Sequence, residues 1–242
     1  MLQINAVYPS FDGEVNKFGI GAPTIFLRTQ GCHLRCYKKT KGILCDTPEG
    51  LERDNTKLVG NSDILDILYK IRNKTGISKV TLTGGDPLWQ PESDLIDLFY
   101  HLELNEFDTT VETSGTISIA PFTKQNFKKL WWVLDYKLPS TGVPESQVLK
   151  TLENLPFLKN GDFVKFVIDD IIDLREMLNV ISDNPCGGQY AAGLFWGSKN
   201  LTNLQLYNAL MEHSVCHKVV MNFQTHKLIL NPDYSVQVPK LL

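Results

Sequence analysis

Three cysteines that lie within one short loop are the first candidates for chemistry. Cys32, Cys36 and Cys45 follow the segment Arg28-Thr-Gln-Gly, and the triplet Cys45-Asp46-Thr47 closes the loop. Three thiolates can hold three irons of a [4Fe–4S] cubane and leave the fourth iron open to a small molecule. The same spacing also fits a structural zinc site that takes its fourth ligand from His33, Cys216 or His217. Spacing alone leaves both interpretations open.

A glycine-rich turn, Gly84-Gly85-Asp86-Pro87, is the second candidate. It directly follows the segment 79–83, which has the pattern of a short strand. Two successive glycines let a backbone approach a ligand closely and present N–H and C=O groups, as a polar amino-acid moiety needs. Such a turn is common by itself. Downstream of three clustered cysteines it favours the iron–sulfur interpretation over zinc.

The elements that must position these residues alternate along the chain from residue 62 onward, which is typical of βα units around a parallel sheet. Parallel strands place ligands at their C-terminal ends. We expect an α/β fold, a partial (β/α) barrel of about six or seven mostly parallel strands, with an open doubly wound sheet as the alternative. The expected strands are 24–28, 79–83, 109–112, 131–136, 162–168, 190–195 and 217–223, and the expected helices are 61–74, 92–103, 124–129, 146–155, 172–182 and 202–213.

Length, charge and cysteine count exclude several classes of protein. The 242 residues, 43% of them hydrophobic, are enough for one full core. A formal charge of −3 without a basic run argues against direct binding of nucleic acid. Neither a leader segment nor an apolar run of ~18 residues is present, so we expect a cytoplasmic protein without membrane contact. Five cysteines, an odd number, argue against a disulfide framework.

The order of these motifs resembles the radical S-adenosylmethionine (SAM) superfamily, whose usual forms are CxxxCxxC and GGEP. More narrowly, the chain resembles the 7-carboxy-7-deazaguanine synthase family over most of its length. It departs from the family pattern in the eight residues between Cys36 and Cys45, in Asp86 where Glu is usual, and in the Phe-Asp-Gly-Glu-Val segment near the start. The matching segments are 11–14, 26–32, 45–47, 82–87, 111–116, 135–137, 165–168 and 224–227.

The resemblance implies one radical SAM domain over 1–242, with a cluster-binding loop at 32–47. Cys32, Cys36 and Cys45 would bind the [4Fe–4S] cluster, and Thr47 would give an oxygen ligand to Mg²⁺. The residues that the resemblance implies for SAM are Leu44, Asp46, Gly84, Gly85, Asp86, Glu112, Ser114, Asp135, Tyr136, Lys137 and Gln224.

The substrate implied by the resemblance is 6-carboxy-5,6,7,8-tetrahydropterin, a flat ring that carries a carboxylate. Arg28 can pair with that carboxylate as a bidentate fork, and Glu14 or the backbone of 12–13 can read the amino edge of the ring. No residue is assigned as a general acid or base. The full set implied for the substrate is Phe11, Asp12, Gly13, Glu14, Arg28, Thr83, His226 and Leu242.

The implied reaction starts with reductive cleavage of SAM and removal of the hydrogen at C6 of the pterin. Ring contraction with loss of ammonia then gives 7-carboxy-7-deazaguanine, in queuosine-type 7-deazapurine biosynthesis, while Mg²⁺ orients the carboxylate. The implied partners are an electron donor such as flavodoxin or ferredoxin and a second copy in a homodimer. Two alternatives remain: an activase that places a glycyl radical on a partner protein, and a zinc-stabilised binding module. The Cys45-Asp46-Thr47 triplet favours the pterin enzyme.

Several conspicuous residues have structural explanations. Aromatic side chains on the expected strands fit the core better than a stacking role, and Cys186 fits a loop. The residues between Cys36 and Cys45 carry three lysines and are expected to form an exposed excursion. The aromatic residues concerned are Trp131, Trp132, Phe163 and Phe166, and the lysines are Lys38, Lys39 and Lys41.

Overall fold

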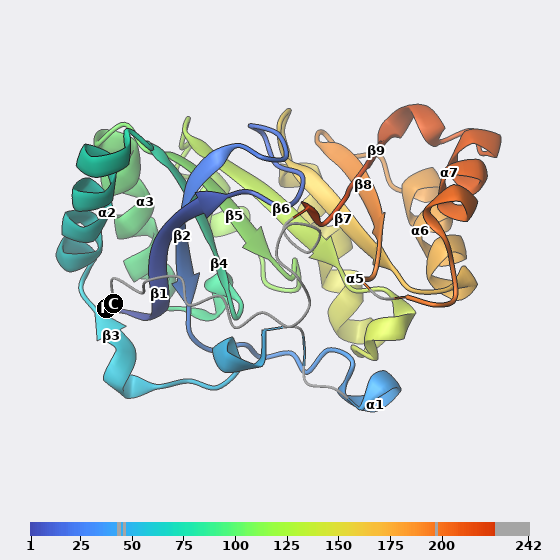
Figure 1. The fold of residues 1–242 in the computed structure, drawn as a ribbon, viewed down its shortest axis with the longest axis horizontal. Helices are drawn as coiled ribbons and strands as arrows, with labels where there is room; N and C mark the ends of the chain where they lie inside the picture. Colours follow the sequence, from blue (N-terminus) through green and yellow to red (C-terminus); the bar gives the residue numbers. More distant parts are fainter. Residues whose placement is uncertain (43–44, 46, 197, 226–242) are drawn as a thin grey trace.

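The computed structural model describes residues 1–42, 45, 47–196 and 198–225, and it contains a curved nine-stranded sheet (Figure 1). The strand order is β3-β1-β2-β4-β5-β6-β7-β8-β9. Strand β1 is antiparallel to its neighbours β2 and β3, and all other neighbouring pairs are parallel. The strands are β1 (Leu2–Phe11), β2 (Pro23–Thr29), β3 (Leu58–Val59), β4 (Lys79–Gly84), β5 (Asp108–Thr113), β6 (Leu130–Tyr136), β7 (Phe163–Ile168), β8 (Gln189–Leu194) and β9 (Val219–Met221).

The seven strands expected from the sequence are the parallel strands β2 and β4 to β9. The sheet has two edges, β3 and β9, within the described residues, so the prediction of a partial barrel is confirmed. Strands β1 and β3 were not expected. In β1 the polar side chains of Gln3 and Asn5 are buried and hydrogen-bonded to the side chains of Asn55 and Gln30, so two of its buried positions are not apolar.

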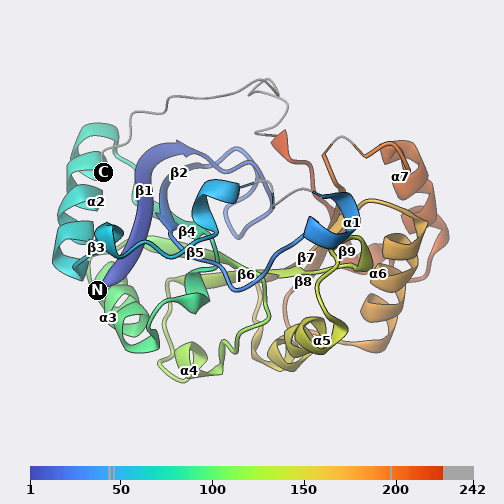
Figure 2. The same cartoon turned by 90° about the horizontal axis from the view of Figure 1, so that it is seen from below.

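Within the described residues, six helices cover the outer face of the sheet, and a helix of four residues lies in the cysteine loop (Figure 2). Five of the six expected helices are confirmed within two residues at each end. The helix expected at 124–129 is wrong: the chain is helical over Ala120–Thr123 instead, and Asn126 has a φ of 58° that breaks a helix. The helices are α1 (Lys38–Lys41), α2 (Asn61–Thr75), α3 (Glu92–Leu104), α4 (Ala120–Thr123), α5 (Glu145–Asn154), α6 (Ile171–Asp183) and α7 (Asn203–Glu212).

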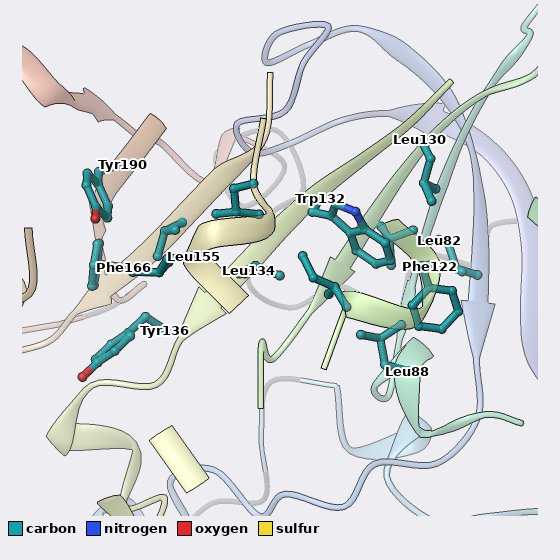
Figure 3. Packing of buried hydrophobic residues seen from close by; sticks show 14 of the residues in the cluster. Leu82, Leu88, Phe122, Leu130, Trp132, Leu134, Tyr136, Leu155, Phe166 and Tyr190 are labelled. Carbon is teal, nitrogen blue, oxygen red and sulfur yellow. The ribbon is translucent and has the colours of Figure 1, made fainter. Parts of the chain in front are cut away.

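The two faces of the parallel strands have opposite characters because side chains alternate between them. The outer face is apolar and packs against the helices, as Figure 3 shows for Leu82, Trp132, Leu134 and Phe166. The inner face carries a small apolar cluster around Phe163 and otherwise polar side chains from β4 to β7. Among the aromatic residues expected in the core, only Trp131 is half-buried, where it contacts Phe18 edge-on at 5.2 Å between centroids.

No helix in the described ranges is long and apolar enough to span a bilayer.

Candidate active site

The cysteine loop begins where β2 ends, at the C-terminal edge of the parallel strands (Figure 1). Backbone N–H groups of Gly31 and Cys32 donate to the carbonyls of residues 50 and 51, which holds the start of the loop against its end. Cys32 and Cys36 are buried in an apolar cluster with Leu34, Tyr37 and Leu51, and Cys45 packs against it. The structure therefore brings the three predicted cluster ligands together.

The thiols of the cysteine loop are compared with the two kinds of metal site that the sequence leaves open, a cubane and a single zinc ion. Nowhere in the described part of the chain do three or more His, Cys, Asp or Glu side chains gather closely enough to share one metal ion. Zinc needs its ligands within ~2.3 Å of one centre, whereas each thiolate of a cubane binds a separate iron at its own corner. Cys216 and His217 precede β9, at the opposite end of the parallel strands, so they cannot complete a zinc site here.

Cys32 lies in surroundings that favour the neutral thiol. Burial raises the pKa of Cys32 to about 11, and the neighbouring Asp86 and Cys36 add to the shift. A cation that binds the sulfur is needed to hold it as a thiolate at neutral pH. The Cys32 thiol is therefore in place for a cluster, whose positive charge would favour its thiolate form.

The Gly84-Gly85 turn packs against the chain that enters the cysteine loop. Gly84 has a φ of 119°, and a Cβ on it would lie 2.4 Å from the Thr29 carbonyl oxygen. A Cβ on Gly85 would lie only 2.1 Å from the Gly31 carbonyl oxygen. Backbone N–H groups of Gly85 and Asp86 donate to these same two carbonyls. Glycine is therefore required at both positions because the turn packs closely against the backbone of Thr29 and Gly31. The ligand contact that the sequence suggests would be a second reason.

Asp86 joins this turn to the segment after β5. Its carboxylate is almost fully buried and accepts hydrogen bonds from the hydroxyls of Thr113, at 2.6 Å, and Ser114. It also accepts from the Leu88 backbone N–H, at 3.2 Å, and lies 3.8 Å from Nδ1 of His33. The roles of Asp86 near the amino group of SAM and of Ser114 beside its ribose and carboxylate remain predictions, and both residues also stabilise the turn.

A set of charged side chains lies on the inner face of β5 to β7. Lys137 Nζ is 3.0 Å from Asp135 Oδ2, and Glu112 Oε2 accepts from the Thr83 hydroxyl at 3.0 Å. Burial raises the pKa of the Glu112 carboxyl. Burial opposes the charge of Lys137, but Asp135 together with Cys36 and Tyr37 raises the pKa of Lys137 well above its ordinary value. Lys137 is therefore an ammonium ion beside the cysteine loop.

Tyr136 points the other way, as the alternation along β6 requires. Its ring lies in the core near Phe166, and its hydroxyl donates to Glu176 of α6 at 3.1 Å (Figure 3). The prediction that Tyr136 borders the cofactor can therefore concern only its backbone.

The residues predicted to bind the substrate divide into two groups. In the first, Glu14 accepts from Gln224 Nε2 at 2.7 Å, and Thr83 is paired in register with Arg28. Arg28 is half-buried; its guanidinium lies 3.5 Å from Glu49, and its Nε is buried without a hydrogen-bond partner. This group faces the interior. The Gly13 carbonyl accepts from the Thr225 N–H at 2.9 Å, which ties the N-terminal loop to the segment after β9.

The side chains of the second group lie elsewhere. Asp12 is buried in an ion pair with Lys79, at the beginning of β4, and also accepts from Thr81 and Asn16. Phe11 is 64% exposed at the far end of β1. The prediction that these two side chains contact the substrate is not supported by their positions, so only their backbone remains a candidate. Leu44, Asp46, His226 and Leu242 lie outside the described residues.

Thr47 and Lys165 complete the description of the site. The Thr47 hydroxyl lies 3.7 Å from Cys45 Sγ, where its oxygen is available to a cation beside the cluster. Lys165 contacts Glu14 and was not assigned a role from the sequence. The signal was present, because Phe-Val-Lys-Phe-Val-Ile places one lysine at an inward position of an otherwise apolar strand.

Comparison with known proteins supports the iron–sulfur interpretation. Residues 18–140 match the family model described as "4Fe-4S single cluster domain". The 7-carboxy-7-deazaguanine synthase of Clostridium acetobutylicum is 30% identical over 232 residues, which cover 93% of this chain and 95% of the relative. The synthase of Leptospira interrogans is 30% identical over 243 residues, with 96% and 97% covered.

Two solved structures resemble the fold. Streptococcus suis SuiB bound to precursor peptide SuiA superposes with a TM-score of 0.57 and 14% identity, over 81% of this chain and 47% of SuiB. SuiB bound to S-adenosylmethionine gives 0.54 and 15%, over 79% and 48%. The chain spans about half the length of SuiB, and at these identities the likeness concerns the fold alone.

The partial barrel, the cysteine loop at its strand ends and the matching cluster domain together place this chain among the radical SAM enzymes, which use a [4Fe–4S] cluster with SAM. Relatives that align over nearly its whole length define it further: the chain belongs to the 7-carboxy-7-deazaguanine synthase family. Neither the activase nor the zinc module is favoured.

Proposed function

We propose that this chain converts 6-carboxy-5,6,7,8-tetrahydropterin into 7-carboxy-7-deazaguanine, with ammonia as the other product, in 7-deazapurine biosynthesis. The relatives with this activity in their name support the proposal. The observation that carries it in the structure is the unpartnered, buried Nε of Arg28 on the inner face, in the same interior as the carboxylate of Glu14. A pterin with a carboxylate at one end and N–H donors at the other matches this pair of groups.

Arg28 is suited to the carboxylate of the substrate. Its present partner, Glu49, is 51% exposed and lies at 3.5 Å, which is a weak, solvent-screened ion pair. A guanidinium has five N–H donors in a fixed fork, so a carboxylate that reaches Nε can be bound through two parallel hydrogen bonds. The substrate would thus satisfy a buried donor that the protein itself does not.

Glu14 is suited to the amino edge of the ring. A carboxylate accepts up to about four hydrogen bonds, so Glu14 can accept N–H donors of the pterin in addition to those of Lys165 and Gln224. Its position is fixed by the neighbouring backbone, because Gly13 and Val15 are both hydrogen-bonded to the segment after β9. Arg28 and Glu14 would together orient the flat ring.

The cofactors fit the residues at the strand ends. The three cysteines would hold the cluster, the turn at 84–86 with Asp135 would border SAM, and Thr47 would donate one oxygen ligand to Mg²⁺. When bound, the cluster and SAM supply the radical chemistry that the side chains themselves lack. Lys137 places a positive charge beside Cys36, which offsets the negative charge of a cluster thiolate.

We propose further that the electron donor is a flavodoxin or ferredoxin, that the enzyme acts as a homodimer, and that it works in the cytoplasm. A reducing compartment suits a chain whose cysteines serve as metal ligands.

The test is anaerobic reconstitution with iron and sulfide, followed by incubation with SAM, dithionite, Mg²⁺ and 6-carboxy-5,6,7,8-tetrahydropterin. Mass spectrometry should detect 7-carboxy-7-deazaguanine and ammonia in equal amounts, and Cys45→Ala should abolish both. If SAM is cleaved but 7-carboxy-7-deazaguanine does not form, the proposed substrate is wrong. Bound zinc without cleavage of SAM would contradict the whole proposal.

A further inference from the structure

Lys165 is a buried cation that lies among carboxylates from three different parts of the chain. Its ammonium group contacts Glu14 of the N-terminal loop and lies 3.5 Å from Asp135 of β6, and its side chain is 9% exposed. Glu112 of β5 also acts on it through its charge. These carboxylates raise the pKa of Lys165 although burial opposes its charge, so the side chain is an ammonium ion.

The position of Lys165 is not explained by stability of the fold. The neighbours of Lys165 along β7 are apolar, and β7 pairs with β6 and β8 through its backbone. Removing a charge from water is costly, and buried ion pairs can often be replaced by apolar residues of similar size without loss of stability. A lysine at this position has its main effect on the carboxylates that it contacts.

Glu14 is the carboxylate that this contact immobilises. Lys165 binds its Oε2 and Gln224 binds its Oε1, so the group is held from β7 on one side and from the segment after β9 on the other. With one donor on each oxygen, rotation of the carboxylate breaks at least one hydrogen bond. Its orientation toward the interior is therefore fixed before any ligand arrives.

We propose that Lys165 is a positioning residue that holds Glu14 in the orientation required to bind the amino edge of the substrate. This inference rests on the proposed function, because it assumes that a pterin is the molecule that Glu14 reads. Lys165 acts on substrate binding through Glu14.

The first test compares Lys165→Gln with the wild-type holoenzyme. We expect the KM for 6-carboxy-5,6,7,8-tetrahydropterin to rise roughly 10- to 100-fold with a much smaller change in kcat, because a misplaced binding group weakens binding. Cleavage of SAM by dithionite in the absence of substrate is measured for the same variant, because Lys165 also lies 3.5 Å from Asp135, which is predicted to border SAM. Lys165→Arg, which keeps the charge, should recover part of the lost affinity.

Lys129→Gln is the matched control. Lys129 also lies between a glutamate and an aspartate, 2.6 Å from Glu106 and 3.9 Å from Asp108, but it is 32% exposed and precedes β6, at the opposite end of the strands. Its loss should leave the KM unchanged. Lys165→Met, which keeps the length of the side chain without its charge, should show the same rise in KM as Lys165→Gln. The folded fraction of both variants is measured by circular dichroism, because each leaves the carboxylates of Glu14 and Asp135 without their cation.

The decisive test is a double-mutant cycle with Glu14→Gln. If Lys165 acts through Glu14, Lys165→Gln should change the KM by less than about 2-fold once Glu14 has been replaced. Additive effects of the two substitutions, or a wild-type KM in Lys165→Gln, would overturn the inference and leave the proposed function intact. Absence of product from the wild-type enzyme would overturn both.

Discussion

Gly85 lies where the turn after β4 touches the start of the cysteine loop. An added Cβ would lie 2.1 Å from the Gly31 carbonyl oxygen and 2.6 Å from that of Gly50, and both are backbone atoms that cannot swing away. Gly85→Ala should therefore destabilise the protein by about 1–3 kcal/mol and reduce the iron bound after reconstitution. Chemical denaturation and iron content check this.

Gly60→Ala is the control for that prediction. Gly60 precedes α2 with a φ of −73°, and its added Cβ would meet the side chains of Asp63, at 3.3 Å, and Ser62, at 3.6 Å, but no backbone atom within 4 Å. Iron content should be unchanged. Equal losses of iron in the two variants would show that contact with the cysteine loop is not the reason for a glycine at position 85.

Asp162 gives the stability of the protein a defined dependence on pH. It is fully buried, and its carboxylate accepts from the backbone N–H groups of Trp132, at 2.9 Å, and Lys159, at 2.8 Å. Burial outweighs these donors and raises the pKa of Asp162 to about 6. The folded state therefore binds a proton more tightly than the unfolded state. The contribution of Asp162 to stability grows as the pH falls from about 6 to 3.8, the ordinary pKa of an aspartate.

We expect the urea midpoint of the wild-type apoprotein to include a rise between pH 7 and pH 5 that Asp162→Asn lacks. Asparagine does not titrate, although it loses the second acceptor oxygen and should be less stable overall. Midpoints measured across this range in parallel check the difference. An identical slope for both proteins would mean that Asp162 has no raised pKa.

At the scale of elements, the short helix α1 is docked to the rest of the protein rather than extended into solvent. The expected exposure of Lys38 and Lys39 is confirmed, but Lys41 is half-buried, 2.6 Å from Asp169 and above the ring of Phe195 at 4.8 Å. The Thr40 hydroxyl donates to the Ser140 carbonyl at 2.5 Å. The lengthened loop between Cys36 and Cys45 thus contacts the segments that follow β6, β7 and β8.

Lys41→Ala should undock α1 because it leaves the buried carboxylate of Asp169 without its cation. The cost should be about 1–3 kcal/mol, and trypsin should cleave the loop faster. Lys38→Ala, which removes an exposed lysine from the same helix, serves as the control. Equal cleavage rates in Lys41→Ala and wild type would show that the ion pair does not hold the loop.

The sequence predicts the helices and strands more fully than it predicts which side chains contact one another. The parallel strands and most helices are predicted because apolar side chains repeat with the period of each element. Strand β1 is missed because Gln3 and Asn5 look like surface residues, whereas their side chains are hydrogen-bonded to Asn55 and Gln30 inside the protein. The cysteines are recognisable from spacing, whereas Glu14 and Lys165, which pair in the structure, lie 151 residues apart in the chain.

At the scale of the whole molecule, the loop between β1 and β2 is hydrogen-bonded to the segment that follows β9, the last strand of the sheet. Val15 donates its backbone N–H to Asn222 Oδ1 at 3.0 Å, and Thr225 donates to the Gly13 carbonyl at 2.9 Å. Asn222 is 3% exposed and follows β9, the last strand of the sheet. These bonds lie on either side of Glu14, so the predicted substrate-binding carboxylate depends on closure between two distant segments.

Asn222→Ala should weaken that closure while leaving the rest of the sheet intact. The Val15 N–H would lose the acceptor that Asn222 provides, at a cost of about 1–3 kcal/mol. Hydrogen–deuterium exchange should become faster in residues 12–16 and stay unchanged in α2, which packs on the opposite part of the molecule and serves as the internal control. Faster exchange in α2 as well would mean that Asn222 stabilises the whole fold. Unchanged exchange at 12–16 would show that other contacts hold Glu14, and substrate affinity would then be independent of Asn222.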